Sequence, residues 1–396
     1  MLFSGVLGIY ACNRYFKKLA LITFQFVNSV QTFWWYKVIK EEVIDKFYKL
    51  FHISRVVKMS LEIKTNIPVE DKSGDGPAHQ ATRLAVCQNN IFYADGPTLV
   101  SVHCESLRND PNNHVAIKRV VNLPSRIQSI AAQTNGHVAI VDSLGNLFVS
   151  NGHNLQHFDL EETSQKYVSK ESGWCGVAIH ELNQSIAVSN MWSRNTFITG
   201  TSALFEHELP PTSLAASASQ DGVYFVTEWN NITIWDSRAS RGGLVERLIE
   251  TQIGGGGSGP LWSTSSCENY FCVGGEDRTV SLYDVRKNRL VDTWRTPLKD
   301  DIVMSKLYRD RSNVLSCAVL GLDHEICTWN SGCASTDNDI TSAVDEASDR
   351  RTNFGRLHHN HRVFRAKSRW SGMSFLEQRK MIGRDSEGTL YMFAIE

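Results

Sequence analysis

The sequence predicts an all-β protein built from a repeated unit of four short strands. Two apolar strands joined by a short polar turn recur along the chain, as in Ser219 to Asp236 and in Ser266 to Asp284. Seven such pairs follow one another, mostly at intervals of about 40 to 50 residues, which is the period of a propeller blade. A further apolar strand before each pair and another after it complete four strands per unit. These observations predict a seven-bladed β-propeller.

Length and composition agree with one large globular fold. The chain has 396 residues, of which 42% are hydrophobic and 21% are charged, as in proteins that bury a substantial core. Basic and acidic residues number 41 and 42, so the formal net charge is -1. No net field therefore attracts the molecule to nucleic acid or to anionic lipid. The nine cysteines include no C-x-x-C pair, which favours a reducing compartment, and we expect a cytoplasmic or nuclear location.

Residues 1–52 are expected to form an apolar, partly helical extension outside the propeller. Residues 38–51 have the apolar spacing of an amphipathic helix. The uncharged stretch from Leu19 to Tyr36 is long enough to span a membrane, but one third of it is polar, which is costly in lipid. We expect no membrane contact. Because the composition changes at Met59, the extension is interpreted as isoform-specific, or as sequence upstream of the true start.

Residues 53–396 are assigned to the propeller, and residues 53–67 are expected to close its ring. The chain stops after the third strand of the last blade, so a fourth strand must come from elsewhere or leave an exposed edge. Apolar and polar residues alternate from Val57 to Ile63, as expected for a strand with one buried face. Residues 333–360 lie between the last two blades without a strand pattern, which predicts a surface loop.

Two of the repeats resemble WD40 repeats. The resemblance is carried by Ile232 to Asp236 (ITIWD) and by Gly274 to Asp284 (GGEDRTVSLYD), and it extends as a pattern over roughly residues 79–396. It implies that Asp277 is the turn aspartate that orients its blade by hydrogen bonding, with Asp323 in the same role one blade later. The Gly-His dipeptides that usually open WD40 blades are missing from their places, so no subfamily is resolved.

No catalytic or metal-binding motif stands out. The glycine run at 254–257 lacks the lysine and the helix of a phosphate-binding loop and is interpreted as a link between blades. The histidines between 358 and 361 follow two cysteines in the sequence, but not at zinc-site spacing. No nucleophile or general base can be assigned. We expect no enzyme activity, no metal, no cofactor and no small-molecule substrate.

The sequence contains one basic segment that is a candidate for binding a negatively charged partner. Residues 350–369 hold seven Lys and Arg residues and follow an acidic stretch. Charges segregated by sign are typical of a solvated loop. The alternative is a contact with an acidic protein or with RNA phosphates.

The connections between the second and third strands are expected to form a binding face, here called the turn face, because in a propeller they all emerge on one side. Tryptophan and arginine, which are enriched at binding hot spots, occur repeatedly in these connections. The candidate binding residues are Trp192, Arg194, Trp229, Arg278, His324 and Arg384. The alternative is that the tryptophans pack within their own blades.

The sequence thus favours a non-enzymatic scaffold, a propeller subunit that binds other proteins in a complex. The alternative is a reader that grips a short peptide or a modified residue at the turn face, which a deep pocket with convergent polar groups would favour. A third hypothesis is that the propeller is a hydrolase, because the fold alone does not decide the function. Clustered carboxylates with shifted pKa at the central channel would favour it.

Overall fold

The structure is a computed structural model that divides into two compact units, residues 1–56 and residues 57–396. The residues that it describes all belong to the second unit: 61–66, 83–104, 117–133, 135–150, 155–158, 173–200, 203–239, 243–248, 259–310, 313–322, 324–330, 362–376 and 380–394. The predicted extension and the predicted loop at 333–360 lie outside these residues and stay predictions. No helix in the described part is long and apolar enough to cross a membrane.

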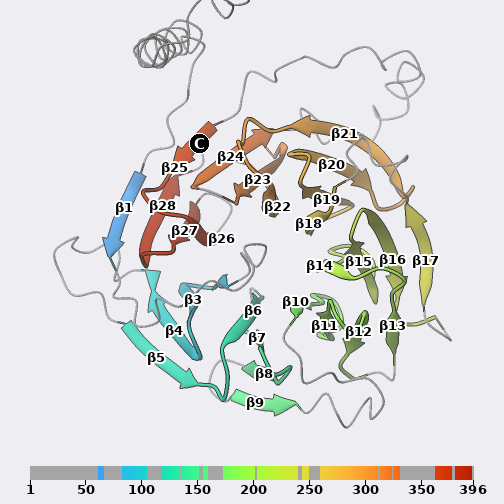
Figure 1. Cartoon of the computed structure of the whole chain (residues 1–396), viewed down its shortest axis with the longest axis horizontal. Coiled ribbons are helices and arrows are strands. Elements are labelled where there is room, and N and C mark those ends of the chain that lie inside the picture. Colours follow the sequence, from blue (N-terminus) through green and yellow to red (C-terminus); the bar gives the residue numbers. More distant parts are fainter. Residues whose placement is uncertain are drawn as a thin grey trace, which may run out of the picture. The chain divides into compact units, whose positions relative to one another are not determined.

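The described residues form seven antiparallel four-stranded sheets around a central axis (Figure 1), which confirms the seven-bladed propeller. Blade 1 contains β2 (Leu84–Cys87), β3 (Asn90–Asp95), β4 (Thr98–His103) and β5 (Ile117–Asn122). Blade 2 contains β6 (Ile127–Ala132), β7 (Val138–Asp142), β8 (Leu147–Ser150) and β9 (Leu155–Phe158). Blade 3 contains β10 (Trp174–Ile179), β11 (Ile186–Asn190), β12 (Asn195–Ile198) and β13 (Leu204–Glu206).

The remaining blades repeat this order. Blade 4 contains β14 (Pro211–Ala216), β15 (Val223–Glu228), β16 (Asn231–Asp236) and β17 (Leu244–Leu248). Blade 5 contains β18 (Leu261–Cys267), β19 (Tyr270–Gly275), β20 (Thr279–Asp284) and β21 (Arg289–Arg295). Blade 6 contains β22 (Ile302–Arg309), β23 (Leu315–Gly321), β24 (Glu325–Asn330) and β25 (Arg362–Arg365). Blade 7 contains β26 (Trp370–Leu376), β27 (Lys380–Asp385), β28 (Thr389–Ala394) and β1 (Leu61–Asn66).

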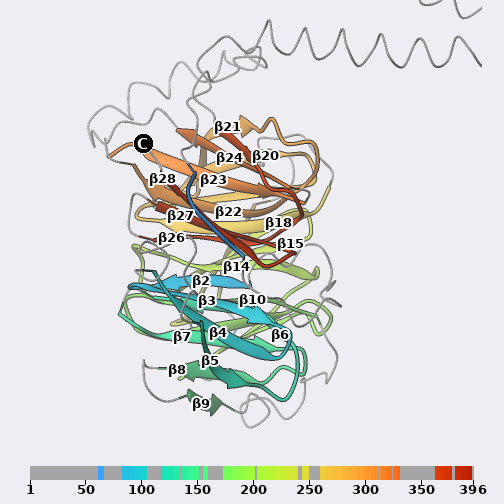
Figure 2. The same ribbon diagram turned by 90° about the vertical axis from the view of Figure 1, so that its left-hand side faces the viewer.

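The ring closes through the first and last strands of the described chain. β1 pairs antiparallel with β28, with Lys64 opposite Tyr391, and so supplies the fourth strand of blade 7 (Figure 2). It comes from within the segment 53–67 that the alternation pattern selects. Because the strand covers the edge of β28, blade 7 does not leave that ladder unpaired.

The first strand of every blade lies nearest the axis (Figure 1). In blades 2 to 7 this strand carries a β-bulge directly after its first paired residue. The bulge therefore sits at the same register in six blades. This regularity identifies equivalent positions around the channel, which the sequence alone does not reveal.

The hydrophobic core lies between neighbouring blades. Phe225 on β15 stacks on Phe271 of the next blade with ring centroids 4.2 Å apart, and Trp294 stacks on Trp329 at 5.5 Å. All four side chains are buried. Each blade thus covers the apolar face of its neighbour, as expected when no single blade can bury both of its faces.

Candidate binding face and central channel

The connections between second and third strands lie beside the connections that lead to the next blade. The carbonyl of Arg194 accepts a hydrogen bond from the N–H of His207 at 2.8 Å, and the carbonyl of Arg278 accepts one from Thr296 at 2.8 Å. The carbonyl of His324 accepts the corresponding bond in blade 6. The turn face is therefore built in the same way from blade to blade, on a rigid frame.

Six of these seven connections contain a described residue with positive φ. In blades 1, 2 and 7 that residue is a glycine: Gly96, Gly145 and Gly388. In blades 3, 4 and 5 it is a large residue: Arg194 at 56°, Trp229 at 55° and Arg278 at 61°. Positive φ is uncommon outside glycine because Cβ crowds the backbone. Three consecutive blades thus hold a large side chain where the backbone favours glycine.

Arg278 and Gly388 occupy the same place in the same kind of turn. The N–H of Arg278 donates to the carbonyl of Gly275 at 3.1 Å, and the N–H of Gly388 donates to the carbonyl of Asp385 at 3.1 Å. Each residue directly precedes the third strand of its blade. The arginine is therefore not required by the turn, which glycine forms equally well.

The two candidate tryptophans are partly packed and partly in solvent. Trp192 is 60% exposed and Trp229 is 42% exposed. The ring of Trp229 meets Trp262 edge to face at 5.9 Å. Trp192 lies against Gly173, where an added Cβ would be 2.1 Å from its Cδ1. Each indole is thus held by a neighbour while much of it faces water, so neither tryptophan is packed wholly within its blade.

Two further features extend this surface. Leu144, in the corresponding connection of blade 2, is 50% exposed. Arg194 donates from Nη1 to the carbonyl of Glu208 at 3.0 Å, and Arg278 donates from Nη1 to Leu298 at 3.3 Å. Carbonyl oxygens orient these guanidinium groups without cancelling their charge. Blades 2 to 5 therefore present apolar side chains beside oriented cations, and His324 in blade 6 is also exposed.

Arg384 does not belong to the turn face, and its predicted placement is wrong. β27 continues to Asp385, so Arg384 lies within the strand, where it is only 6% exposed. Its guanidinium lies 4.4 Å above the ring of Tyr93 and donates from Nη1 to the carbonyl of Ala94 at 3.4 Å. Burial lowers the pKa of Arg384. The side chain joins blade 7 to blade 1.

The resemblance implies two turn aspartates, Asp277 and Asp323. Asp277 accepts a hydrogen bond from the N–H of Thr279 at 2.9 Å, and Asp323 lies outside the described residues. Sequence reasoning missed the acidic residues that end four of the second strands: Asp95, Asp142, Glu228 and Asp385. Their recurrence at one position of the repeat was a signal in the sequence. Asp385, for example, is buried and accepts the N–H of Thr389 at 2.8 Å.

A buried hydrogen-bond network joins blades 3 and 4. His207 contacts Thr196 Oγ1 through Nε2 at 2.8 Å and donates from Nδ1 to Glu228 Oε1 at 2.8 Å. The hydroxyl of Thr233 donates to the same carboxylate oxygen at 2.6 Å and accepts Nε1–H of Trp235. Burial alone would raise the pKa of Glu228, but the hydrogen bonds from His207 and Thr233 outweigh it, so this pKa is lowered.

The order of hydroxyl, imidazole and carboxylate in this network matches that of a hydrolase triad. Thr196 and Glu228 are both 0% exposed. A substrate therefore has no path to the hydroxyl in this conformation. The network braces the interface between two blades, a role in which every polar group is satisfied by a neighbour.

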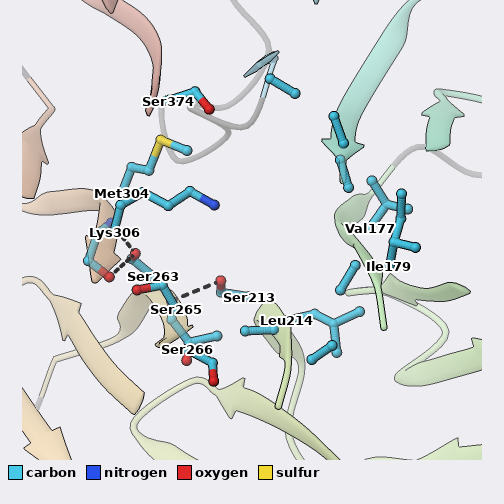
Figure 3. Close-up of a pocket in the computed structure, with 18 of the residues that line it drawn as sticks. Val177, Ile179, Ser213, Leu214, Ser263, Ser265, Ser266, Met304, Lys306 and Ser374 are labelled. Atoms are coloured by element: carbon cyan, nitrogen blue, oxygen red, sulfur yellow. Dashed lines mark hydrogen bonds between the residues drawn. The ribbon is translucent and has the colours of Figure 1, made fainter. Parts of the chain in front are cut away.

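The central channel contains a cavity of about 240 Å³ lined by the first strands (Figure 3). Small and hydroxylated residues dominate its wall, and among the described residues that line it only Glu181 and Lys306 are charged. No clustered carboxylates of the kind a hydrolase needs lie among these lining residues. The part of the chain that the structure describes also holds no group of three potential metal ligands.

Comparisons with known proteins agree on the fold. No family model matches the chain, and no curated protein matches it. Among solved structures, 1522 chains match. One is a chain in the crystal structure of a mitotic checkpoint complex, with a TM-score of 0.58 and 10% identity over 85% of this chain and 92% of that chain. This likeness agrees with the seven-bladed β-propeller fold. At this identity the likeness carries no activity or partner, because propellers host many unrelated functions.

Proposed function

We propose that this propeller is a non-enzymatic scaffold that binds another protein through the turn face of blades 2 to 5. The observation that carries the proposal is the placement of Arg194, Trp229 and Arg278 at positive φ, where other blades use glycine. Non-glycine residues also have positive φ in connections on the opposite face, at Gln184, Glu268 and Asn313. The strain therefore supports a functional site only together with the exposed tryptophans and the oriented arginines of the turn face. Glycine would relieve the backbone strain at these three positions.

The chemistry of the surface suits a protein partner. Trp192, Trp229 and Leu144 offer large exposed apolar area, and Arg194 and Arg278 lie beside them with unneutralised charge. The tryptophan rings have few rotatable bonds, and the two arginines are already oriented by carbonyl oxygens, so fixing these side chains on binding costs less conformational entropy. These residues come from successive blades, so one partner surface can contact all of them.

A reducing location is part of the proposal. Six cysteines whose side chains the structure describes carry free thiols, as in cytoplasmic and nuclear proteins. The balanced net charge of -1 argues against nucleic acid and membrane surfaces as main partners. We therefore place the scaffold in the cytoplasm or the nucleus, as a subunit of a protein complex.

Affinity purification of the tagged full chain from its native organism tests this proposal. The test variant carries Trp229→Gly and Arg278→Gly, and the control variant carries Leu182→Ser. Leu182 is 57% exposed and lies between β10 and β11, at the opposite face of the same propeller. We expect stoichiometric partners of the parent protein and the control to be lost from the double variant. Equal recovery with a folded double variant contradicts the assignment.

A further inference from the structure

One level of the central channel is formed by a single residue from each blade. Each of these residues lies on the first strand of its blade. Its pairing partner on the second strand is the residue three positions before the last residue of that strand; Lys306, for example, pairs with Ala318, and β23 ends at Gly321. The seven equivalents are Ala85, Ala131, Ala178, Ala215, Ser265, Lys306 and Ser374. All seven line the cavity. Six of them are alanine or serine, so the lysine is an exception that the architecture does not require.

The side chain of Lys306 extends into the open channel (Figure 3). Its ammonium makes no hydrogen bond or ion pair with another described residue. Burial lowers the pKa of Lys306. The other charged lining residue, Glu181, lies in the connection after β10 and is exposed. Since a partly buried cation without a partner is costly, its retention points to an anion that arrives from outside.

Two polar side chains independently indicate a ligand in the same cavity. The amide of Gln133 is buried, at 5% exposure, and neither its nitrogen nor its oxygen has a hydrogen-bond partner. The hydroxyl of Thr264 is also buried without a partner. Both residues line the cavity. Buried polar groups in native proteins are normally hydrogen-bonded, so these groups have capacity for a bound molecule.

We propose that the channel binds a carboxylate on a short aliphatic stem, with Lys306 as its counter-ion. One lysine matches one negative charge, whereas phosphate sites usually gather several cations or backbone N–H groups. Val177 and Ile179 lie across the cavity from Lys306, with Leu214 on the wall between the two sides (Figure 3), and they offer an apolar wall to the stem. The volume of about 240 Å³ is below the roughly 300 Å³ at which drug-sized pockets begin.

The carboxylate has two possible sources, an acidic side chain of a peptide and a free small carboxylic acid. Ligand-observed NMR titrations of the full chain separate them, with butyrate and the blocked tripeptide acetyl-Ala-Glu-Ala-amide as probes. The same tripeptide with glutamine serves as the neutral control, and inorganic phosphate as the competing anion. Tighter binding of the peptide than of butyrate assigns the side chain, and the reverse order assigns the free acid.

Lys306→Met tests the residue, and Lys287→Met is its matched control on an exposed turn. We expect Lys306→Met to weaken carboxylate binding at least tenfold while Lys287→Met leaves it unchanged. Lys306→Ala, which leaves only alanine and serine at the seven equivalent positions, provides a second variant. The proposal is overturned by binding that survives in both Lys306 variants, by no carboxylate binding at all, or by phosphate binding as tightly. These results do not depend on the turn face, so either proposal can fail alone.

Discussion

Replacing Arg278 by glycine separates the contribution of the side chain to binding from the backbone strain that the side chain causes. The residue has φ of 61° in a turn that Gly388 forms with the same hydrogen bond in blade 7. Glycine at this position should therefore keep the turn intact while removing the half-buried guanidinium. Alanine removes the same guanidinium but keeps a Cβ in the unfavourable region.

The expected change in stability follows from three contributions. Removing Cβ from a left-handed residue relieves strain and stabilises the folded protein by about 1 to 2 kcal/mol. The greater conformational entropy of glycine in the unfolded chain lowers stability by about 0.5 to 1 kcal/mol. The hydrogen bonds from Arg278 to Leu298 and Lys299 are 3.3 and 3.4 Å long, and their loss costs about 0.5 kcal/mol each. The net change for Arg278→Gly is within about 1 kcal/mol of zero. Arg278→Ala should be about 1 kcal/mol less stable than Arg278→Gly.

Denaturant unfolding of both variants measures this difference, and a binding assay with the purified partner measures the function. Both variants should lose affinity to a similar extent, by about 2 kcal/mol if Arg278 is a hot spot. Gly388→Ala is the control, because it adds a Cβ at a φ of 85° and should destabilise without affecting binding. An alanine variant as stable as the glycine variant, or undiminished binding by either, would refute the reasoning.

Three further predictions concern the frame. Because the pKa of Glu228 is lowered in the folded protein, its charged carboxylate stabilises the fold at pH values above the unfolded-state pKa of about 4.3. This stabilisation is lost as the pH falls through the folded-state pKa. Unfolding free energies from pH 7 down to about 3 should therefore drop more steeply for the parent protein than for Glu228→Gln. Arg384→Ala should lower stability by about 2 kcal/mol or more, because it removes a buried group, and an unchanged melting temperature would exclude that role. Deleting 1–66 should lower the melting temperature relative to deleting 1–52, since only the former removes β1.

Local patterns predicted the blades because each strand pair is contiguous in the sequence. The hairpin from Val223 to Asp236 joins a largely apolar strand to an alternating strand through a two-residue turn, and the structure pairs the two as β15 and β16. The same pattern located Trp229 and Arg278 in connections. It could not show their positive φ, because glycine and non-glycine turns share the same spacing.

The failures arise where contacts join distant residues. The sequence pattern places Arg384 in a turn, but in the structure β27 includes both Arg384 and Asp385. The side chain of Arg384 is therefore buried against Tyr93, which lies in blade 1. His207 and Glu228 are separated by 21 residues, so no local spacing connects them. The channel ring depends on bulges, which shift the register without leaving a residue signature.

Lys306 offers a test of whether a residue is kept for function or for packing, using stability alone. If its methylene stem packs against the channel wall, Lys306→Ala should lower the free energy of unfolding by about 1 kcal/mol or more, while Lys306→Met, which keeps the stem, should not. If the unpartnered ammonium is the main feature, both substitutions remove a desolvated charge and should raise stability, by about 1 kcal/mol. The placement of six alanine and serine residues at equivalent positions shows that small side chains suffice there. We therefore expect Lys306→Ala and Lys306→Met both to be at least as stable as the parent protein in denaturant unfolding. If Lys306→Ala is destabilised while Lys306→Met is unchanged, the lysine is kept for packing instead.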